Sequence, residues 1–323
     1  MARVAITGSS GFIGTNLVQR CLDNRDTVVG FDVVPPRNAA HMEIFRHLDC
    51  LDRGTLRGAL EDLKPDYIFH LAARTDLGGT TVQEYAINSG GTENLCIVSC
   101  AIPTLKRIVF VSSMLVCKPG YRPSGDEDYC PTTAYGESKV LAEEAIRSSK
   151  ALKCEWVIAR PTHIWGPWFG APYLQFFSAI QRGLYLHPID VTIRKSFGFV
   201  GNAAFQLDRM ARSEGNINAR TIYVSDYEPL DVGLWADAIA DAMKVRRPRR
   251  VPLTFLRALA VAGDALKWTG LGHPPLTSFR LSNMLTETSF DLTATQEICG
   301  EVPYTVEQGI RCTLAWMSEM RRQ

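Results

Sequence analysis

The first half of the chain alternates short apolar runs with longer segments in which apolar residues recur at helical spacing. The apolar runs predict strands at 3–7, 26–33, 44–50, 65–73, 107–113 and 154–161. The intervening segments predict helices at 12–24, 53–63, 82–101 and 134–149. Strands that alternate with helices of this length are typical of right-handed βαβ units. We therefore predict an α/β fold with a doubly wound, parallel, Rossmann-type sheet.

The alternation stops after Pro161, where residues 163–173 are rich in glycine, proline and aromatic side chains. Further on, only mixed helices and short strands are indicated. With 323 residues the chain is long for one compact unit. We predict a Rossmann domain over 1–165 and a smaller mixed lobe over 166–323, some segments of which return to the sheet.

Composition excludes several classes of partner. The net charge is +1, so we expect no nucleic acid, and we interpret the basic run 244–250 as a solvated helix end. The longest apolar stretch, 251–266, contains Arg257 and Asp264 and is too short and charged to span a membrane. Nine scattered cysteines without a CxxC pair indicate reduced thiols, no metal site and a cytoplasmic location. We expect no leader segment before the first strand.

A glycine-rich turn, "TGSSGFIG", follows the first predicted strand and opens the first predicted helix. Gly8 suits a tight turn, Gly11 lets a pyrophosphate approach the backbone, and Gly14 lets helix pack on strand. Backbone N–H groups at a helix N-terminus attract phosphate. A ligand-free turn would use the same residues, so the surrounding sequence has to decide between the two interpretations.

An acid at the end of the second predicted strand favours the dinucleotide interpretation. Asp32 can accept hydrogen bonds from both hydroxyls of an adenosine ribose and would repel a 2′-phosphate, which predicts NAD rather than NADP. Arg37 lies nearby and would weaken that preference. Asp49, at the end of the third strand, either meets the adenine edge or serves as a turn or helix-capping acid.

Tyr135 and Lys139 lie four residues apart in the most strongly helical segment, which places them on one helix face. A tyrosine is a poor base at neutral pH, but a neighbouring ammonium and a positive nicotinamide ring would lower its pKa. The preceding strand ends at Ser113, at the sheet edge where ligands bind. A serine hydroxyl there can hold a reacting oxygen against Tyr135.

These motifs together resemble a known family. The segments that carry the resemblance are "TGSSGFIG", Asp32, "HLAAR", "INSGGTENL", "VSSMLVC", "YGESK" and "ARPTHIWGP". They follow the family's order over residues 4–167, and the chain resembles an extended short-chain dehydrogenase/reductase of the NAD-dependent epimerase/dehydratase branch. Later segments, such as "SFGFVG", "YVSDYEPL" and "PYTVEQGIRCTLAW", resemble it more weakly.

The resemblance implies a catalytic triad of Ser113, Tyr135 and Lys139, NAD as the cofactor and no metal. Lys139 would also bind the nicotinamide ribose, and Asn88 would have a mainly structural role beside the cofactor. The implied cofactor-binding residues are Gly8, Gly11, Phe12, Ile13, Gly14, Asp32, Asp49, Cys50, Leu71, Ala72, Ala73, Asn88, Tyr135, Lys139 and Pro161. The implied substrate-binding residues are Arg74, Ser113, Met114, His163, Arg194 and Lys195.

The chain departs from its relatives at positions that narrow the reaction. Related 4,6-dehydratases have an acidic pair directly after the catalytic serine or threonine, where this chain has Met114 and Leu115. Neither side chain can move a proton, so we expect no dehydration by that mechanism. His163 replaces an asparagine that meets a diphosphate in sugar-nucleotide epimerases. His163 as a loop histidine with internal partners is an equal alternative to His163 as a phosphate ligand.

We therefore expect NAD-dependent hydride transfer at a secondary alcohol of a nucleotide-sugar, with 4-epimerisation through a transient ketone and Tyr135 as the base. A 3β-hydroxysteroid or sterol-type dehydrogenase and a nucleotide-sugar ketoreductase are the alternatives. A protein that senses NAD without catalysis would need a broken triad, and all three residues are present. From the resemblance we also expect a homodimer that pairs the helix with Tyr135 and the helix from Val82.

Overall fold

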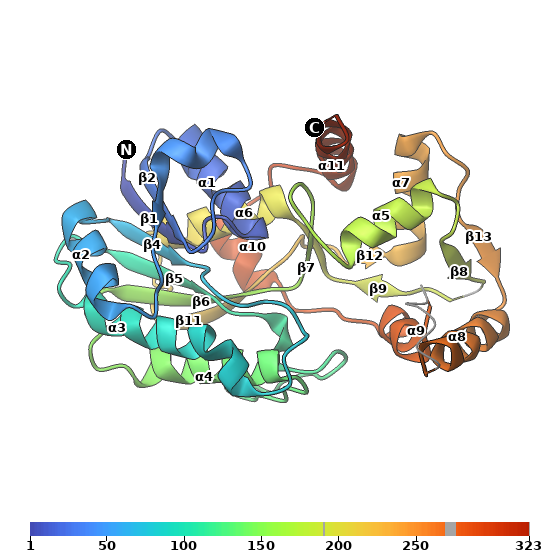
Figure 1. The fold of residues 1–323 in the computed structure, drawn as a ribbon, viewed down its shortest axis with the longest axis horizontal. Helices are drawn as coiled ribbons and strands as arrows, with labels where there is room; N and C mark the ends of the chain where they lie inside the picture. Colours follow the sequence, from blue (N-terminus) through green and yellow to red (C-terminus); the bar gives the residue numbers. More distant parts are fainter. Residues whose placement is uncertain (190, 269–275, 323) are drawn as a thin grey trace.

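A seven-stranded parallel sheet forms the centre of the protein (Figure 1). The computed structural model describes residues 1–189, 191–268 and 276–322. The strand order is β11-β6-β5-β4-β1-β2-β3. The strands are β1 (Arg3–Thr7), β2 (Thr27–Asp32), β3 (Phe45–His47), β4 (Tyr67–His70), β5 (Arg107–Val111), β6 (Glu155–Pro161) and β11 (Arg220–Val224). The predicted doubly wound α/β fold is confirmed.

Helices cover both faces of this sheet. In Figure 1, α1 (Phe12–Asp23) and α6 (Val200–Arg212) lie above it, and α3 (Thr92–Ser99) and α4 (Ala134–Ser148) lie below. Helix α2 (Arg53–Leu63) packs against α3. Because side chains alternate across a strand, each strand contributes to two cores. In β1, Val4 and Ile6 join one buried cluster and Ala5 joins the other.

The helix predicted at 82–101 is present over 82–99, but it is not a regular α-helix. The chain passes without a break through a 3-10 turn, η2 (Val82–Tyr85), a π-turn, η3 (Ile87–Gly91), and then α3. Glycine is a weak helix former, and Gly90 and Gly91 stand side by side at the irregular point. A Cβ atom at Gly91 would lie 3.3 Å from the Cβ atom of Cys50, so the turn packs closely on the loop after β3.

The second half of the chain adds one strand to the sheet and builds a smaller group of elements at the end opposite α2 (Figure 1). Three two-stranded sheets occur among the described residues, and they pair β7 (His163–Trp165) with β10 (Phe197–Phe199), β8 (Leu186–Pro188) with β13 (Arg249–Val251) and β9 (Arg194–Lys195) with β12 (Leu230–Asp231). The helices are α5 (Tyr173–Gln181), α7 (Val232–Met243), α8 (Leu253–Trp268), α9 (Ser278–Leu285), α10 (Thr293–Cys299) and α11 (Val306–Met320). The 3-10 turns η1 (Ala39–Ile44) and η4 (Met114–Val116) complete the elements described.

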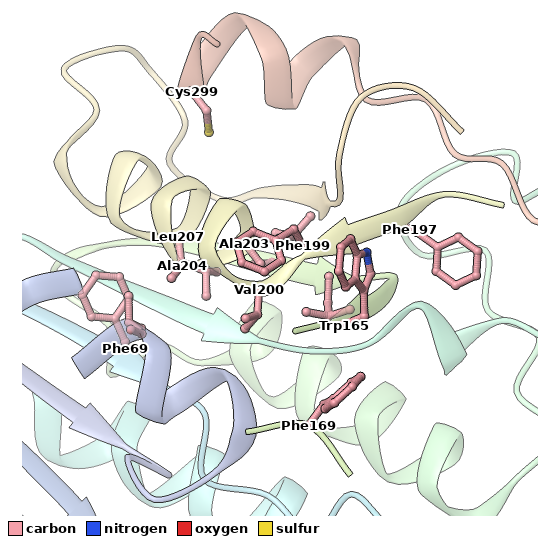
Figure 2. Packing of buried hydrophobic residues seen from close by; sticks show 14 of the residues in the cluster. Phe69, Trp165, Phe169, Phe197, Phe199, Val200, Ala203, Ala204, Leu207 and Cys299 are labelled. Atoms are coloured by element: carbon pink, nitrogen blue, oxygen red, sulfur yellow. The ribbon is translucent and has the colours of Figure 1, made fainter. Parts of the chain in front are cut away.

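An aromatic core joins the smaller group to the sheet. Figure 2 shows Trp165, Phe197 and Phe199 beside the residues of α6 that pack toward Phe69 of β4. The ring centroids of Trp165 and Phe199 are 5.3 Å apart, a separation at which tilted aromatic rings attract each other. The two halves of the molecule therefore share one buried cluster. Within the described part of the chain, no helix combines the length and the apolar character needed to cross a bilayer.

Candidate active site

A cavity of about 850 Å³ opens at the carboxyl ends of the central strands. This edge is where ligands bind in open α/β sheets, and the strand order turns here, since β1 has β2 on one side and β4 on the other. With the exception of Asn88, every residue that the sequence predicted for the cofactor lines the cavity. Two of the predicted substrate residues, Arg74 and Ser113, line it as well.

The glycine turn between β1 and α1 leaves no room for side chains. Gly8 has a φ angle of +70°, and a Cβ atom there would lie 2.5 Å from the carbonyl carbon of Leu71. A Cβ atom at Gly14 would lie 2.1 Å from the oxygen of Gly8. The helix begins after Gly11, which offers no side chain to cap its first N–H groups. Those groups can therefore bind a phosphate, and the turn fits a dinucleotide.

Asp32 is positioned by the same turn. Its Oδ2 atom accepts a hydrogen bond of 3.0 Å from the Ser10 N–H, and its Oδ1 atom accepts one of 3.2 Å from the Val34 N–H. Arg37 also lines the cavity, but its guanidinium donates to the carbonyl oxygens of Ser10 and Trp168, each at 2.9 Å. The carboxylate thus lines the cavity beside the glycine turn.

Asp49 is a turn acid that also faces the cavity. Its Oδ1 atom accepts a hydrogen bond of 2.9 Å from the Leu51 N–H. The N-cap of α2 is Asp52, whose carboxylate accepts from the Gly54 and Thr55 N–H groups. Asp49 therefore does not cap the helix, but it can act as a turn acid and can also meet the adenine edge in the cavity.

Helix α4 positions Tyr135 and Lys139. Its N-cap, Thr133, accepts a hydrogen bond of 3.0 Å from the Gly136 N–H. A Cβ atom at Gly136 would lie 2.4 Å from the Leu115 oxygen, so the first turn of α4 packs directly on η4. This close contact brings Tyr135 to Ser113, the N-cap of η4. Sequence reasoning missed Gly136, although it stands inside the YxxxK segment.

Burial sets the proton affinities of these groups. It raises the pKa of the Tyr135 phenol above its usual value, while the hydrogen bond with Ser113 acts in the opposite direction. Burial also lowers the pKa of Lys139 to about 8, against the attraction of the Glu143 carboxylate. The Nζ atom of Lys139 donates a hydrogen bond of 2.8 Å to the Val111 oxygen. The two titratable side chains of the predicted triad are therefore largely buried, in surroundings that shift their pKa values.

A buried carboxylate network supports the centre from behind. Glu143, one helical turn after Lys139, accepts hydrogen bonds from Ser112 (2.6 Å), Tyr129 (3.0 Å) and both the Nε and Nη2 atoms of Arg160 (2.9 and 2.7 Å). These contacts tie α4 to β5 and β6. Sequence reasoning did not identify Glu143. The sequence did contain an indication of it, since Glu143 stands four residues after Lys139, on the helix face that carries Tyr135 and Lys139.

Asn88 lies behind the cavity wall. Its side chain accepts a hydrogen bond of 2.8 Å from the Arg74 N–H and donates to the Arg74 oxygen and to the Ser138 hydroxyl, at 3.0 and 2.8 Å. It therefore fixes the strand end that carries Arg74 against α4. The Arg74 guanidinium pairs with Asp76, with 2.7 Å between Nε and Oδ2.

The structure does not bring the remaining predicted substrate residues to this cavity. The ring nitrogens of His163 are hydrogen-bonded to the Tyr173 and Thr288 hydroxyls at 2.9 and 2.8 Å, and burial lowers its pKa to about 3. The Nζ atom of Lys195 donates to the Asn283 oxygen at 2.6 Å. Arg194 lines neither of the two described cavities. Met114 lines a second, smaller one.

A sterol would need a dry slot lined by aromatic side chains, but the aromatic residues of this region pack on one another. Trp165 is buried against Phe177 and Phe199. Phe169 lies between Phe177 and Trp316 and reaches the cavity wall. Among the described residues, the cavity therefore has neither a diphosphate site built from His163, Arg194 and Lys195 nor an open aromatic slot for a sterol.

Known proteins are similar to this chain over most of its length. A 3 beta-hydroxysteroid dehydrogenase/Delta 5-->4-isomerase of Mycobacterium tuberculosis is 28% identical over 84% of this chain and 75% of its own length. The N-acetyl-alpha-D-glucosaminyl-diphospho-ditrans,octacis-undecaprenol 4-epimerase of Escherichia coli O157:H7 is 26% identical over 97% of this chain and 94% of its own.

Solved structures share the fold over nearly the whole chain. The Bordetella bronchiseptica enzyme WbmH in complex with NAD+ superposes with a TM-score of 0.73 at 20% identity, covering 99% of both chains. The UDP-glucose 4-epimerase of Thermotoga maritima with UDP-glucose gives 0.73 at 16% identity, covering 98% of this chain and 99% of the other.

A model of the NAD dependent epimerase/dehydratase family matches residues 4–222, which is more than half of the chain. The glycine turn, Asp32 and the cavity fit the family's cofactor, and that cofactor is NAD. The protein therefore belongs to the NAD-dependent epimerase/dehydratase family and is an enzyme of the extended short-chain dehydrogenase/reductase type.

Proposed function

We propose that the protein transfers a hydride to and from NAD at a secondary alcohol of a nucleotide-sugar and thereby epimerises C4. One observation carries the chemistry: Ser113, Tyr135 and Lys139 line the same cavity as the glycine turn and Asp32. A substrate alcohol beside Tyr135 would therefore meet the reactive end of a dinucleotide whose adenosine end lies at Asp32.

The triad residues divide the proton transfer among themselves. Ser113 donates a hydrogen bond to the reacting oxygen and orients it, and Tyr135 removes the hydroxyl proton. Lys139, held by the Val111 oxygen, places a positive charge near the phenol and so favours the phenolate. NAD, when bound, supplies the hydride acceptor. The substrate leaves this step as a ketone.

The fate of the ketone decides the net reaction. If the ketone rotates in the cavity and accepts the hydride on its other face, the product is the epimer and NAD is regenerated. Met114 and Leu115 stand beside Ser113 and cannot act as an acid or a base. Their side chains therefore support a reaction without dehydration.

The relatives support a sugar substrate with a diphosphate. The undecaprenol-linked 4-epimerase matches almost the full chain, and the UDP-glucose 4-epimerase of Mycolicibacterium smegmatis is 29% identical over 51% of it. Both names describe 4-epimerases of a sugar attached through a diphosphate.

A 3β-hydroxysteroid dehydrogenase is the second candidate, and helix α8 favours it. Phe255, Leu259 and Leu266 recur at helical spacing on one face of this helix and are 48%, 38% and 42% exposed. An exposed apolar helix face is a surface that suits lipid. Relatives with this activity match most of the chain. In this candidate the ketone leaves and one NADH forms for each turnover.

A thermal-shift screen separates the candidates. UDP-, GDP-, dTDP- and CDP-sugars and a 3β-hydroxysteroid are each added to the NAD-saturated protein, because a ligand of the native state raises the melting temperature. The proposal expects a shift with at least one nucleotide-sugar. A shift with the steroid alone would replace it with the second candidate.

We also propose that the protein is a cytoplasmic homodimer. All nine cysteines are free, as is usual where thiols stay reduced. On α4, Leu141 is 44% exposed and lies beside the half-buried Val140, so this face can pack against a second copy. Light scattering after gel filtration should give twice the mass of the chain. A monomer with the chain's own mass would contradict the dimer.

A further inference from the structure

A second cavity of about 120 Å³ lies beside the catalytic serine and outside the cofactor cavity. The segment 114–122 forms one wall, and 287–290, between α9 and α10, forms the other. Met114 lines this cavity and directly follows Ser113, which lines the first one. A substrate whose reacting alcohol lies at Ser113 can therefore extend the group next to that alcohol into the second cavity.

The wall formed by 287–290 is firmly held. The Ser196 N–H donates a hydrogen bond of 2.7 Å to the Thr288 oxygen, and Lys195 and Thr288 form a β-bridge. The Thr288 hydroxyl is hydrogen-bonded to His163 Nε2 at 2.8 Å. In addition, the Arg194 N–H donates to Glu287 Oε1 at 3.2 Å. This wall is therefore held from outside the cavity by three residues that the family resemblance assigned to the substrate: His163, Arg194 and Lys195.

The opposite wall is an ordered loop that carries two cations. Asp128 organises the loop by accepting hydrogen bonds from the Tyr121 hydroxyl (2.7 Å) and the Ser124 N–H (2.7 Å). Lys118 and Arg122 line the cavity, and neither side chain has a hydrogen-bond or ion-pair partner within the part of the chain that the structure describes. Glu287 is the acidic residue of the lining. Two cations against one carboxylate make the cavity net positive.

We propose that this cavity binds the diphosphate of the substrate, with Lys118 and Arg122 as its cationic ligands. This proposal rests on the proposed function and names the residues that recognise the anionic part of the substrate. A water molecule needs about 10–15 Å³ of cavity volume, so about 120 Å³ accommodates on the order of ten heavy atoms, which is the size of a diphosphate. A positive, partly enclosed site strengthens charge-assisted hydrogen bonds to phosphate oxygens.

The test measures the affinity of the NAD-saturated protein for anions by isothermal calorimetry. Saturation with NAD comes first, so that the glycine turn cannot bind the probe. Inorganic pyrophosphate tests the diphosphate itself, UDP tests a nucleotide source, and farnesyl diphosphate tests a polyprenyl source. We expect the double variant Lys118→Ala/Arg122→Ala to bind the preferred probe at least tenfold more weakly than wild type.

A matched control removes two exposed cations that line neither cavity, in the variant Lys150→Ala/Arg182→Ala. This control should bind the probe as wild type does. Equal affinity of wild type and Lys118→Ala/Arg122→Ala would overturn the proposal, and so would a loss that appears in Arg194→Ala instead. A wild type that binds none of the three probes would overturn it as well.

A kinetic measurement keeps this proposal separate from the proposed function. If wild type epimerises a nucleotide-sugar and Lys118→Ala/Arg122→Ala has the same KM, the subsite is wrong and the function stands. If no nucleotide-sugar turns over, the function itself fails. A KM that rises at least tenfold in the double variant, with the NAD dissociation constant unchanged, supports both.

Discussion

The Nζ atom of Lys139 donates a hydrogen bond of 2.8 Å to the carbonyl oxygen of Val111, the last residue of β5. This contact joins the helix that carries Tyr135 to the strand that leads to Ser113. The Ser113 hydroxyl and the Tyr135 phenol are therefore fixed relative to one another. A proton-transfer site that is positioned in this way loses little free energy to reorganisation during the reaction.

The pH dependence of kcat/KM should report Lys139. Burial lowers its pKa to about 8, so its ammonium is present below that pH and is lost above it. We expect the rate to fall as pH rises through about 8, because the positive charge near Tyr135 disappears. In Lys139→Met this alkaline limb should vanish together with most of the activity. A wild-type rate that keeps rising beyond pH 9 would contradict this role.

Gly14 should not tolerate a side chain. The Cβ atom of alanine would lie 2.1 Å from the Gly8 oxygen, so the turn must shift. We expect Gly14→Ala to lower the free energy of unfolding by about 1–3 kcal/mol and to weaken NAD binding. Gly58→Ala on α2 is the control, since nothing lies within 4 Å of its Cβ position. Equal melting temperatures of the two variants would show that the turn is not close-packed.

The sequence predicted the site better than it predicted the segment behind it. Tyr135, Lys139 and Ser113 could be placed because helical spacing and the end of an apolar strand are local patterns. The irregular turns of the helix expected at 82–101 were not predicted. They are fixed by contacts between segments far apart in sequence, since Asn88 bonds the Arg74 backbone and Gly91 packs on Cys50.

The substrate residues show the same limit. His163 and Lys195 occupy family positions, but their side chains bond Thr288 and Asn283, more than eighty residues further along. Only the folded chain reveals that these partners are present. The Glu143–Arg160 pair was equally invisible, since an acid on a helix is most often a solvated residue.

Asp32 should select NAD over NADP. Its carboxylate lines the cavity beside the glycine turn, where it can accept hydrogen bonds from a ribose and repel a 2′-phosphate. We expect Asp32→Ala to weaken NAD binding roughly tenfold and to narrow the difference in affinity between NAD and NADP. Asp62→Ala, an exposed change on α2, is the control. Unchanged dissociation constants for both cofactors in Asp32→Ala would refute the assignment.

Asp226 should make stability depend on pH. Burial raises its pKa to about 6, although Asn202 and the Phe199 N–H donate hydrogen bonds to it. The folded state therefore keeps its proton to a higher pH than the unfolded state, and the stability that this provides is lost between about pH 4 and 6.

Urea unfolding of wild type and Asp226→Asn measures this effect. The variant does not titrate, so the difference in unfolding free energy should move in its favour by on the order of 2–3 kcal/mol between about pH 4 and pH 7. Two curves that run parallel over this range would show that the carboxyl group ionises normally in the folded protein.

The most direct test of the central claim is turnover of nucleotide-sugars by the NAD-loaded protein, with Tyr135→Phe as the control. The products are resolved by NMR, and NADH is followed by its absorbance. We expect one UDP-, GDP-, dTDP- or CDP-sugar to convert to its C4 epimer without net NADH. Tyr135→Phe should slow this conversion by about 10²-fold or more while NAD still binds. Unchanged turnover in Tyr135→Phe, or oxidation of a 3β-hydroxysteroid with one NADH per product and no reaction of any nucleotide-sugar, would contradict the central claim.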